Sequence, residues 1–117
     1  MPTFIYLMSL TDQGIKGIKD APNRRAESEN KVTDLGGSIV GSYLTMGAYD
    51  RLLIVDLPAG DAAVKLAFGM GTTGNVRTTT MSGYSGDEAI DYFATSLPWH
   101  VPFPLPALAG QRKLSRS

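Results

Sequence analysis

Polar side chains gather around one predicted turn of this sequence and have the residue types of a ligand-binding site. Tyr49 and Asp50 stand in the turn, and Tyr43 and Thr45 precede it on a predicted strand. Asp50 can accept hydrogen bonds or act as a base, and Arg77 can bind an anionic ligand. The structural alternative is that Asp50 bonds turn amides while Tyr49 packs its ring. We predict a small-molecule pocket formed by Tyr43, Thr45, Tyr49, Asp50 and Arg77, with no catalytic residue assigned.

Residues 69–74, Gly-Met-Gly-Thr-Thr-Gly, fit the glycine spacing of dinucleotide-binding loops, but their context is inverted. Such a loop follows a strand and opens a helix, whose N-terminal amides meet the pyrophosphate. Here the glycines follow a predicted helix and lead into a predicted strand. We therefore expect them to end the helix in left-handed conformations. An anion-binding nest beside Arg77 is the alternative.

Other kinds of chemistry lack the residues that they need. The sequence contains no cysteine, which excludes disulfides, thiolate catalysis and cysteine-ligated metal centres. His100 is the single histidine and has no His or Cys nearby, so we predict no metal site and no cofactor. Ser85 does not complete a Gly-x-Ser-x-Gly elbow, because Asp87 occupies the last position, and a helix cap explains it better.

The distribution of charge argues against a nucleic-acid partner. Eleven basic and eleven acidic residues give a formal net charge of zero. Arg112, Lys113 and Arg116 stand in residues 97–117, which hold no carboxylate, so the rest of the chain is mildly acidic. It therefore offers no basic stripe for phosphates. No apolar run reaches membrane-spanning length and no signal peptide is evident, so we expect a cytoplasmic protein without a membrane partner.

Hydrophobic patterns and turn residues predict the elements that position these groups. Short apolar or threonine-rich runs predict strands over residues 3–10, 38–46, 51–57 and 75–84. Between the first two strands, a helix begins at Pro22 and ends at Gly36-Gly37. A second helix is predicted over 61–70, and a third follows the capping-box pair Ser85 and Glu88. The apolar faces of the first two helices are Ala26, Val32 and Leu35, and Ala63, Leu66, Ala67 and Met70.

The order of these elements, βαββαβ followed by a helix, predicts a ferredoxin-like α+β fold with one antiparallel sheet. In that topology the strands over 3–10 and 51–57 are central, and the glycine- and threonine-rich strands are at the edges. We assign residues 1–96 to this domain and residues 97–117 to a proline-rich C-terminal arm. The apolar residues of the arm predict an extended segment that lies on its own domain or on a partner copy, with a frayed basic end.

Both central strands are apolar on both faces, although helices can cover only one face of such a sheet. Leaving Ile5, Leu7, Leu52 and Ile54 in water would forgo roughly 1.5–3 kcal/mol each. Something must therefore cover the second face, and a second copy of the same sheet is the simplest cover for a short chain. The alternative is that the C-terminal helix and arm fold back over it. We predict a homodimer or a higher homo-oligomer.

The hairpin also carries a family resemblance. Tyr43-Leu44-Thr45-Met46-Gly47-Ala48-Tyr49-Asp50 resembles the Gly-x-Tyr-Asp element of the GYD domain family, supported by residues 11–15, 35–37 and 74–78. The resemblance covers roughly residues 3–90. It implies a mostly bacterial protein of the dimeric α/β-barrel superfamily, and it supplies no reaction and no catalytic residues.

Three functions remain open at this point. The first is a homo-oligomeric domain that binds a small molecule through the pocket described above. The second, implied by the resemblance alone, is a cofactor-independent oxygenase or isomerase. The third is a module that serves assembly only, whose sign would be a filled interior without a pocket.

Overall fold

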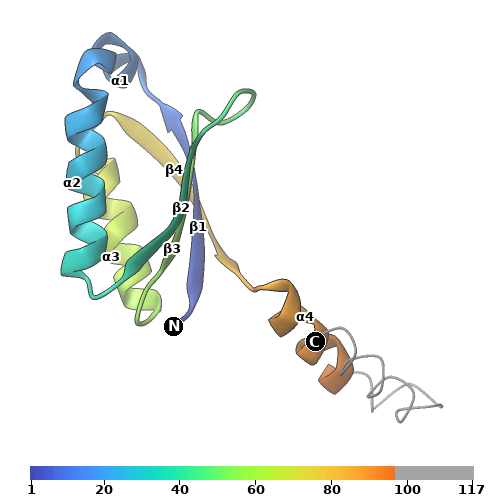
Figure 1. Cartoon of the computed structure of the whole chain (residues 1–117). Helices are drawn as coiled ribbons and strands as arrows, with labels where there is room; N and C mark the ends of the chain where they lie inside the picture. The colour runs from blue at the N-terminus through green and yellow to red at the C-terminus, as the bar shows by residue number, and fades with distance from the viewer. Residues whose placement is uncertain (97–117) are drawn as a thin grey trace. The chain divides into compact units, whose positions relative to one another are not determined.

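The computed structural model describes residues 1–96 of the chain, which divides into the units Met1–Gly83 and Tyr84–Ser117 (Figure 1). The predicted arm of residues 97–117, with His100, lies outside the described residues. The second unit contains α4 (Gly86–Ser96). The first unit contains β1 (Thr3–Leu10), α1 (Asp12–Lys16), the 3-10 turn η1 (Ile18–Asp20), α2 (Ala21–Asp34), β2 (Ser38–Leu44), β3 (Arg51–Asp56), α3 (Gly60–Gly71) and β4 (Val76–Gly83).

The four strands form one antiparallel sheet in the order β2-β3-β1-β4. The predicted α+β fold with β1 and β3 in the centre is therefore confirmed. Ile5 lies opposite Ile54, and Leu7 lies opposite Leu52, so these four side chains share one face of the sheet. The edge strand β2 has an irregularity between Ile39 and Gly41, where a bulge disturbs the ladder least.

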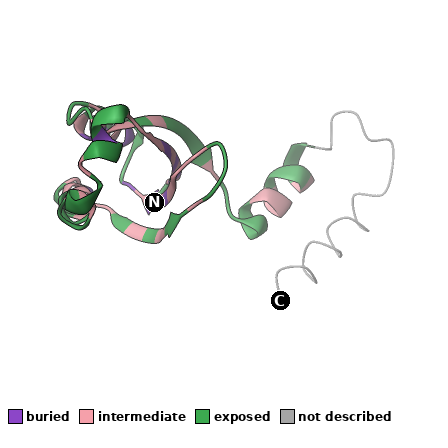
Figure 2. Cartoon of the chain, turned by 90° about the horizontal axis from the view of Figure 1, so that it is seen from above, coloured by how far each residue is buried: buried purple, intermediate pink, exposed green. Residues whose placement is uncertain are grey.

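The hydrophobic core lies between the sheet and helices α2 and α3, which cover the same face (Figures 1 and 2). The predicted face of α3 is confirmed, because Ala63, Leu66 and Met70 are buried. The predicted face of α2 is wrong at Ala26, which is exposed, while Val32 is fully buried. The largest fully buried side chains are Tyr6, Val32, Leu53, Val55, Leu57 and Leu66.

The left-handed glycines predicted after the two long helices of the first unit are confirmed at Gly36 and Gly74, whereas Gly69 and Gly71 lie within α3 without that conformation. After α2, the Gly37 amide donates to the Val32 carbonyl (3.0 Å) and Gly36 adopts a φ of 83°, which is a Schellman ending. After α3, Gly74 adopts a φ of 79° before β4 begins. The glycine-rich segment is therefore a helix end and not a phosphate loop. The predicted capping box of α4 is also present, with the Glu88 amide donating to Ser85 Oγ (3.1 Å).

In the β2–β3 hairpin, the first strand ends two residues earlier than predicted, at Leu44 and not at Met46. The Thr45 amide donates to the Asp50 carbonyl (2.9 Å), and the Thr45 hydroxyl donates to the Tyr49 carbonyl (2.7 Å). These bonds draw Thr45 into the loop. Gly47 has a φ of 117°, which side chains with a β-carbon rarely adopt.

The second face of the sheet has no helix over it within residues 1–83. Ile5, Leu7, Leu52 and Ile54 are partly buried there by their neighbours on the strands. Covering this face would therefore contribute less free energy than the roughly 1.5–3 kcal/mol per side chain that applies to fully exposed residues. Met81 and Tyr43 stay 42% and 57% exposed. An apolar surface thus remains in the single chain.

Candidate functional site

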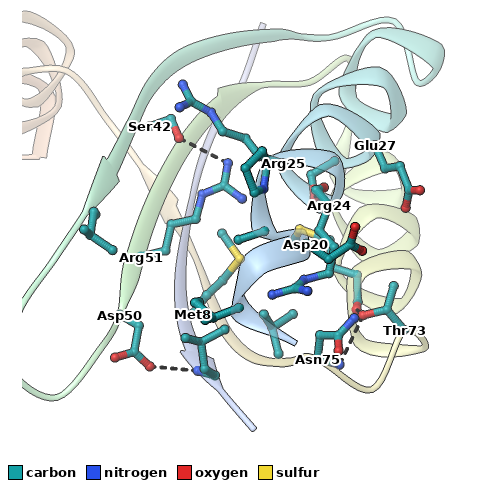
Figure 3. Close-up of a pocket in the computed structure, with 18 of the residues that line it drawn as sticks. Met8, Asp20, Arg24, Arg25, Glu27, Ser42, Asp50, Arg51, Thr73 and Asn75 are labelled. Atoms are coloured by element: carbon teal, nitrogen blue, oxygen red, sulfur yellow. Dashed lines mark hydrogen bonds between the residues drawn. The ribbon is translucent and has the colours of Figure 1, made fainter. Parts of the chain in front are cut away.

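The main cavity of the first unit lies between α2 and the sheet, where β1 ends and β3 begins (Figure 3). Its volume is about 720 Å³. Met8 and Leu10 of β1 form part of an apolar wall, together with Met70 and Val76. Polar and charged side chains from η1, α2 and the start of β3 complete the lining.

Two of the four basic side chains in this lining hold the helices in place. Arg24 Nη1 donates to the Gly17 carbonyl (2.7 Å), after the last residue of α1. Lys31 Nζ donates to the Gly69 carbonyl (3.0 Å), in the last turn of α3. Both cations bond to carbonyls near helix C-termini, where positive charge is favourable. We therefore assign Arg24 and Lys31 structural roles.

The other two basic side chains, Arg25 and Arg51, approach each other on one side of the cavity. Arg51 extends from β3 and donates through Nη2 to Ser42 Oγ (3.1 Å), and Arg25 reaches over from α2 (Figure 3). Arg25 Nε is paired with Glu29 (3.1 Å). Burial, and after it the positive charge of Arg25, lower the pKa of Arg51, and Glu29 partly offsets them. The site thus has a partly buried excess of positive charge at Arg51.

The structure places Asp50 at the edge of this cavity and gives its carboxylate a backbone partner. Asp50 Oδ2 accepts a hydrogen bond from the Leu10 amide (2.8 Å), and the Asp50 amide donates to the Met8 carbonyl (2.8 Å). The carboxylate therefore ties the hairpin to the end of β1. The structural alternative for Asp50 was that it bonds amides of its own turn. The observed bond is of the same kind, but its amide belongs to β1 and not to the turn.

The five predicted site residues do not all meet. Tyr43 borders the cavity together with Asp50. The Tyr43 ring itself lies over Gly41, where a β-carbon would come within 2.9 Å of Cε2. Thr45 and Tyr49 bond to each other within the hairpin loop. Arg77 lies opposite Ser9 on the edge strand β4, outside the cavity lining.

Sequence reasoning missed Arg51, although a signal for it was present. Arg51 alternates with Leu53, Val55 and Leu57, which are fully buried on the helix-covered side of the sheet. A charged residue at a core-facing position of a strand costs free energy unless it has a function or a partner. That pattern makes Arg51 a better candidate for a site residue than Arg77, which is exposed and lies in a Thr-rich strand.

A second hollow of about 380 Å³ lies between α3 and β4. Phe4, Val64, Phe68 and Met81 line it, and no charged side chain does. Its polar side chains are the hydroxyls of Thr80 and Ser82, so it offers fewer groups to orient a ligand than the main cavity does. Among residues 1–96, no three His, Cys, Asp or Glu side chains come together to hold a metal ion. The helices of this part of the chain are all too short or too polar to cross a membrane.

The sheet order, the helices on one face and the closed hairpin together define a ferredoxin-like α+β domain. The GYD domain family model matches residues 4–92, and the chain belongs to this family. This confirms the resemblance seen at the hairpin. Within the motif, Gly47 supplies the left-handed turn conformation and Asp50 supplies the bond to β1.

The chain is 30% identical over 82 residues to the "glutamine synthetase and cystathionine beta-lyase binding protein" of Thermus thermophilus, covering 69% of this chain and 86% of that protein. Its fold is similar to the feast or famine regulatory protein of M. tuberculosis, solved in complex with L-methionine. That match has a TM-score of 0.54 and 22% identity, and it covers 74% of this chain and 54% of the regulator. The chain thus spans about half the length of that regulator.

Proposed function

We propose that this chain is a homo-oligomeric domain that binds a small molecule in the cavity between α2 and the sheet. The cavity itself carries the proposal, because its volume of about 720 Å³ falls within the roughly 300–1,000 Å³ of ligand pockets. The sign expected for a module that serves assembly only was a filled interior without a pocket, and this cavity counts against it.

Binding has more support than catalysis. Asp50, which the sequence offers as a base, uses one carboxylate oxygen to accept the Leu10 amide. The Thermus relative is named as a binding protein. An oxygenase or isomerase of the dimeric-barrel type therefore stays the weaker alternative. Asp50 remains in the proposed site, and Arg25, Ser42 and Arg51 join it. Tyr43 borders the cavity, but it is paired with Leu52 of the free sheet face.

A thermal-shift screen with a matched pair of blocking variants tests the location. Ala21 lines the cavity at the start of α2, whereas Ala26 is exposed on the same helix. Ala21→Trp should fill the cavity and abolish the rise in Tm caused by a hit, while Ala26→Trp should leave it unchanged. A hit that still stabilises Ala21→Trp would place the site elsewhere, and a broad screen without hits would contradict ligand binding.

For the assembly, we propose that a second copy covers the free sheet face. That face presents Ile5, Leu7, Leu52 and Ile54 in the centre and the more exposed Met81 beside them. Apolar side chains of adjacent strands form one continuous patch, which is typical of a protein contact. Two identical faces related by a two-fold axis would cover each other.

Sedimentation velocity distinguishes this interface from its rivals. Ile54→Lys puts a charge in the centre of the patch, and Val64→Lys puts the same charge on the exposed surface of α3. We expect Ile54→Lys to shift the protein to monomer and Val64→Lys to remain oligomeric. A chain truncated after Ser96 should also remain oligomeric. Its dissociation would mean that the arm holds the copies together, and a monomeric parent protein would refute the proposal.

A second candidate function is binding to an enzyme, which the name of the Thermus relative favours. The hairpin offers a surface for such a partner, because Leu44 and Met46 are 91% and 99% exposed. We expect this protein to cosediment with purified glutamine synthetase or cystathionine β-lyase from the organism that encodes this chain. The double variant Leu44→Ser, Met46→Ser should weaken it, and Val64→Ser should not. Absence of any complex with either enzyme would rule this candidate out.

A further inference from the structure

Arg51 differs from the other basic side chains of the cavity in its hydrogen-bond partner. Arg24 and Lys31 bond to helix carbonyls, and Arg25 is paired with Glu29. Among the described residues, the recorded side-chain partner of the Arg51 guanidinium is the Ser42 hydroxyl, a neutral acceptor. A guanidinium has five N–H donors in a planar fork that matches a carboxylate. Most of its donor capacity is therefore available to a ligand.

The surroundings of Arg51 favour an incoming negative charge. Burial and the neighbouring Arg25 both lower its pKa, which means that they destabilise the charged form. An anion at this position would relieve the repulsion between the two guanidinium groups. A hydrogen bond between charged partners is also roughly twice as strong as one between neutral groups.

The charge balance of the lining indicates how much negative charge the ligand carries. The basic side chains number four, and the acidic ones are Asp20, Glu27 and Asp50. Arg25 is already paired with Glu29, which lies outside this lining, so Arg51 is the cation whose hydrogen-bond partner is neither a carboxylate nor a helix carbonyl, and one negative charge on the ligand matches it. A polyphosphate would instead leave several negative charges without partners in a partly buried space.

The rest of the cavity indicates the body of the ligand. Leu10 and Val76 provide partly exposed apolar side chains, whereas Met8 and Met70 are each only 2% exposed and add little accessible surface. Such a wall would gain roughly 25 cal/mol for each Å² of aliphatic surface that the ligand buries.

We infer that the ligand is a small organic acid whose single carboxylate is bound by Arg51, beside Ser42 and Arg25, and whose aliphatic body lies along the apolar wall at Leu10 and Val76. This inference rests on the proposed function, because it names the ligand class of the same cavity. It predicts that affinity depends on the negative charge and on Arg51.

A matched series of ligands tests the charge without any change to the protein. Thermal shift and calorimetry would compare straight-chain carboxylates of increasing length, such as hexanoate, with their neutral amides, such as hexanamide, at constant ionic strength. We expect the carboxylates to bind at least tenfold more tightly than the amides. Hexyl phosphate serves as a dianionic probe and should bind more weakly than the carboxylate of similar length.

Variants test the position of the charge. Arg51→Met should lower carboxylate affinity at least tenfold. Arg51→Lys should retain part of the affinity, because lysine keeps the positive charge but lacks the planar pair of N–H donors that matches a carboxylate. Arg77→Met is the control, since it removes the same charge from the exposed edge strand and should change affinity less than twofold. Circular dichroism would show that each variant is folded.

Each outcome has a distinct meaning. Equal binding of amides and carboxylates, or equal losses in Arg51→Met and Arg77→Met, would overturn the inference. Tighter binding of hexyl phosphate would overturn the assignment to a monoanion. If neutral compounds bind in the cavity and carboxylates do not, the inference fails while the proposed function stands. If no compound of any charge binds, both fail. Should Arg51→Met not fold, the wild-type comparison of acid and amide still decides the question.

Discussion

Removal of the Asp50 carboxylate should destabilise the fold, because that carboxylate holds the hairpin on β1. Its Oδ2 accepts the Leu10 amide at 2.8 Å, and the bond joins residues 40 positions apart in the chain. Asp50→Ala leaves this partly buried amide without its acceptor. Hydrogen bonds to charged groups contribute about 1.5–3 kcal/mol, and we expect a loss of that size in the free energy of unfolding. For a domain of this length, this corresponds to a fall in Tm of at least about 6 °C.

The assay is urea unfolding at one protein concentration, followed by circular dichroism, with two comparison variants. Asp50→Asn keeps an uncharged acceptor and should lose about half as much as Asp50→Ala. Asp34→Ala removes an exposed aspartate from α2 and should stay within about 0.5 kcal/mol of the parent protein. Equal stabilities of Asp50→Ala and Asp34→Ala would refute the reasoning. The motif aspartate would then be free to serve the ligand alone.

Two further predictions concern the core and the loop contacts. Burial raises the pKa of Tyr6 to about 12 from 10.0, and its hydroxyl donates to the Ala63 carbonyl (2.7 Å). A raised pKa stabilises the fold below pH 10, so the advantage of the parent protein over Tyr6→Phe should shrink by up to about 2.7 kcal/mol between pH 10 and 12 in urea titrations. A pH-independent difference would contradict this. A β-carbon at Gly14 would collide with the Asn75 carbonyl, so Gly14→Ala should cost at least about 1–3 kcal/mol. Calorimetric scans of both variants check this: Gly60→Ala, whose β-carbon meets no atom within 4 Å, should be neutral or stabilising, and equal effects of the two substitutions would refute the collision.

Most of the fold could be predicted from the sequence because its signals are local. The apolar run of residues 3–10 matches β1 at both ends, and Gly36-Gly37 ends α2 with the expected bonds. The capping pair Ser85 and Glu88 starts α4 as expected. Each of these signals depends on side chains and amides within a few residues of one another. They can therefore be read from the sequence without knowledge of the tertiary contacts.

The hairpin shows where local signals become insufficient. Turn chemistry placed Gly47 correctly, yet the strand before it ends two residues early, because Thr45 bonds across the loop to Tyr49 and Asp50. Asp50 was expected to serve the turn or a ligand. Its actual partner, the Leu10 amide, is brought there only by the pairing of β3 with β1.

The sequence by itself determined the four strands, the three longer helices, the order of the strands in the sheet and the family, but not α1 or η1. Only the tertiary structure decided which side chains share the cavity. Arg25 and Arg51 are far apart in the chain and meet because α2 packs over the start of β3, whereas Arg77 is separated from them by strand order and by its exposed edge position. The physical reason is that the hydrophobic periodicity of a strand or a helix is set by residues close together in the chain, so the sequence shows it directly. The meeting of two like charges depends instead on how packed layers place distant segments.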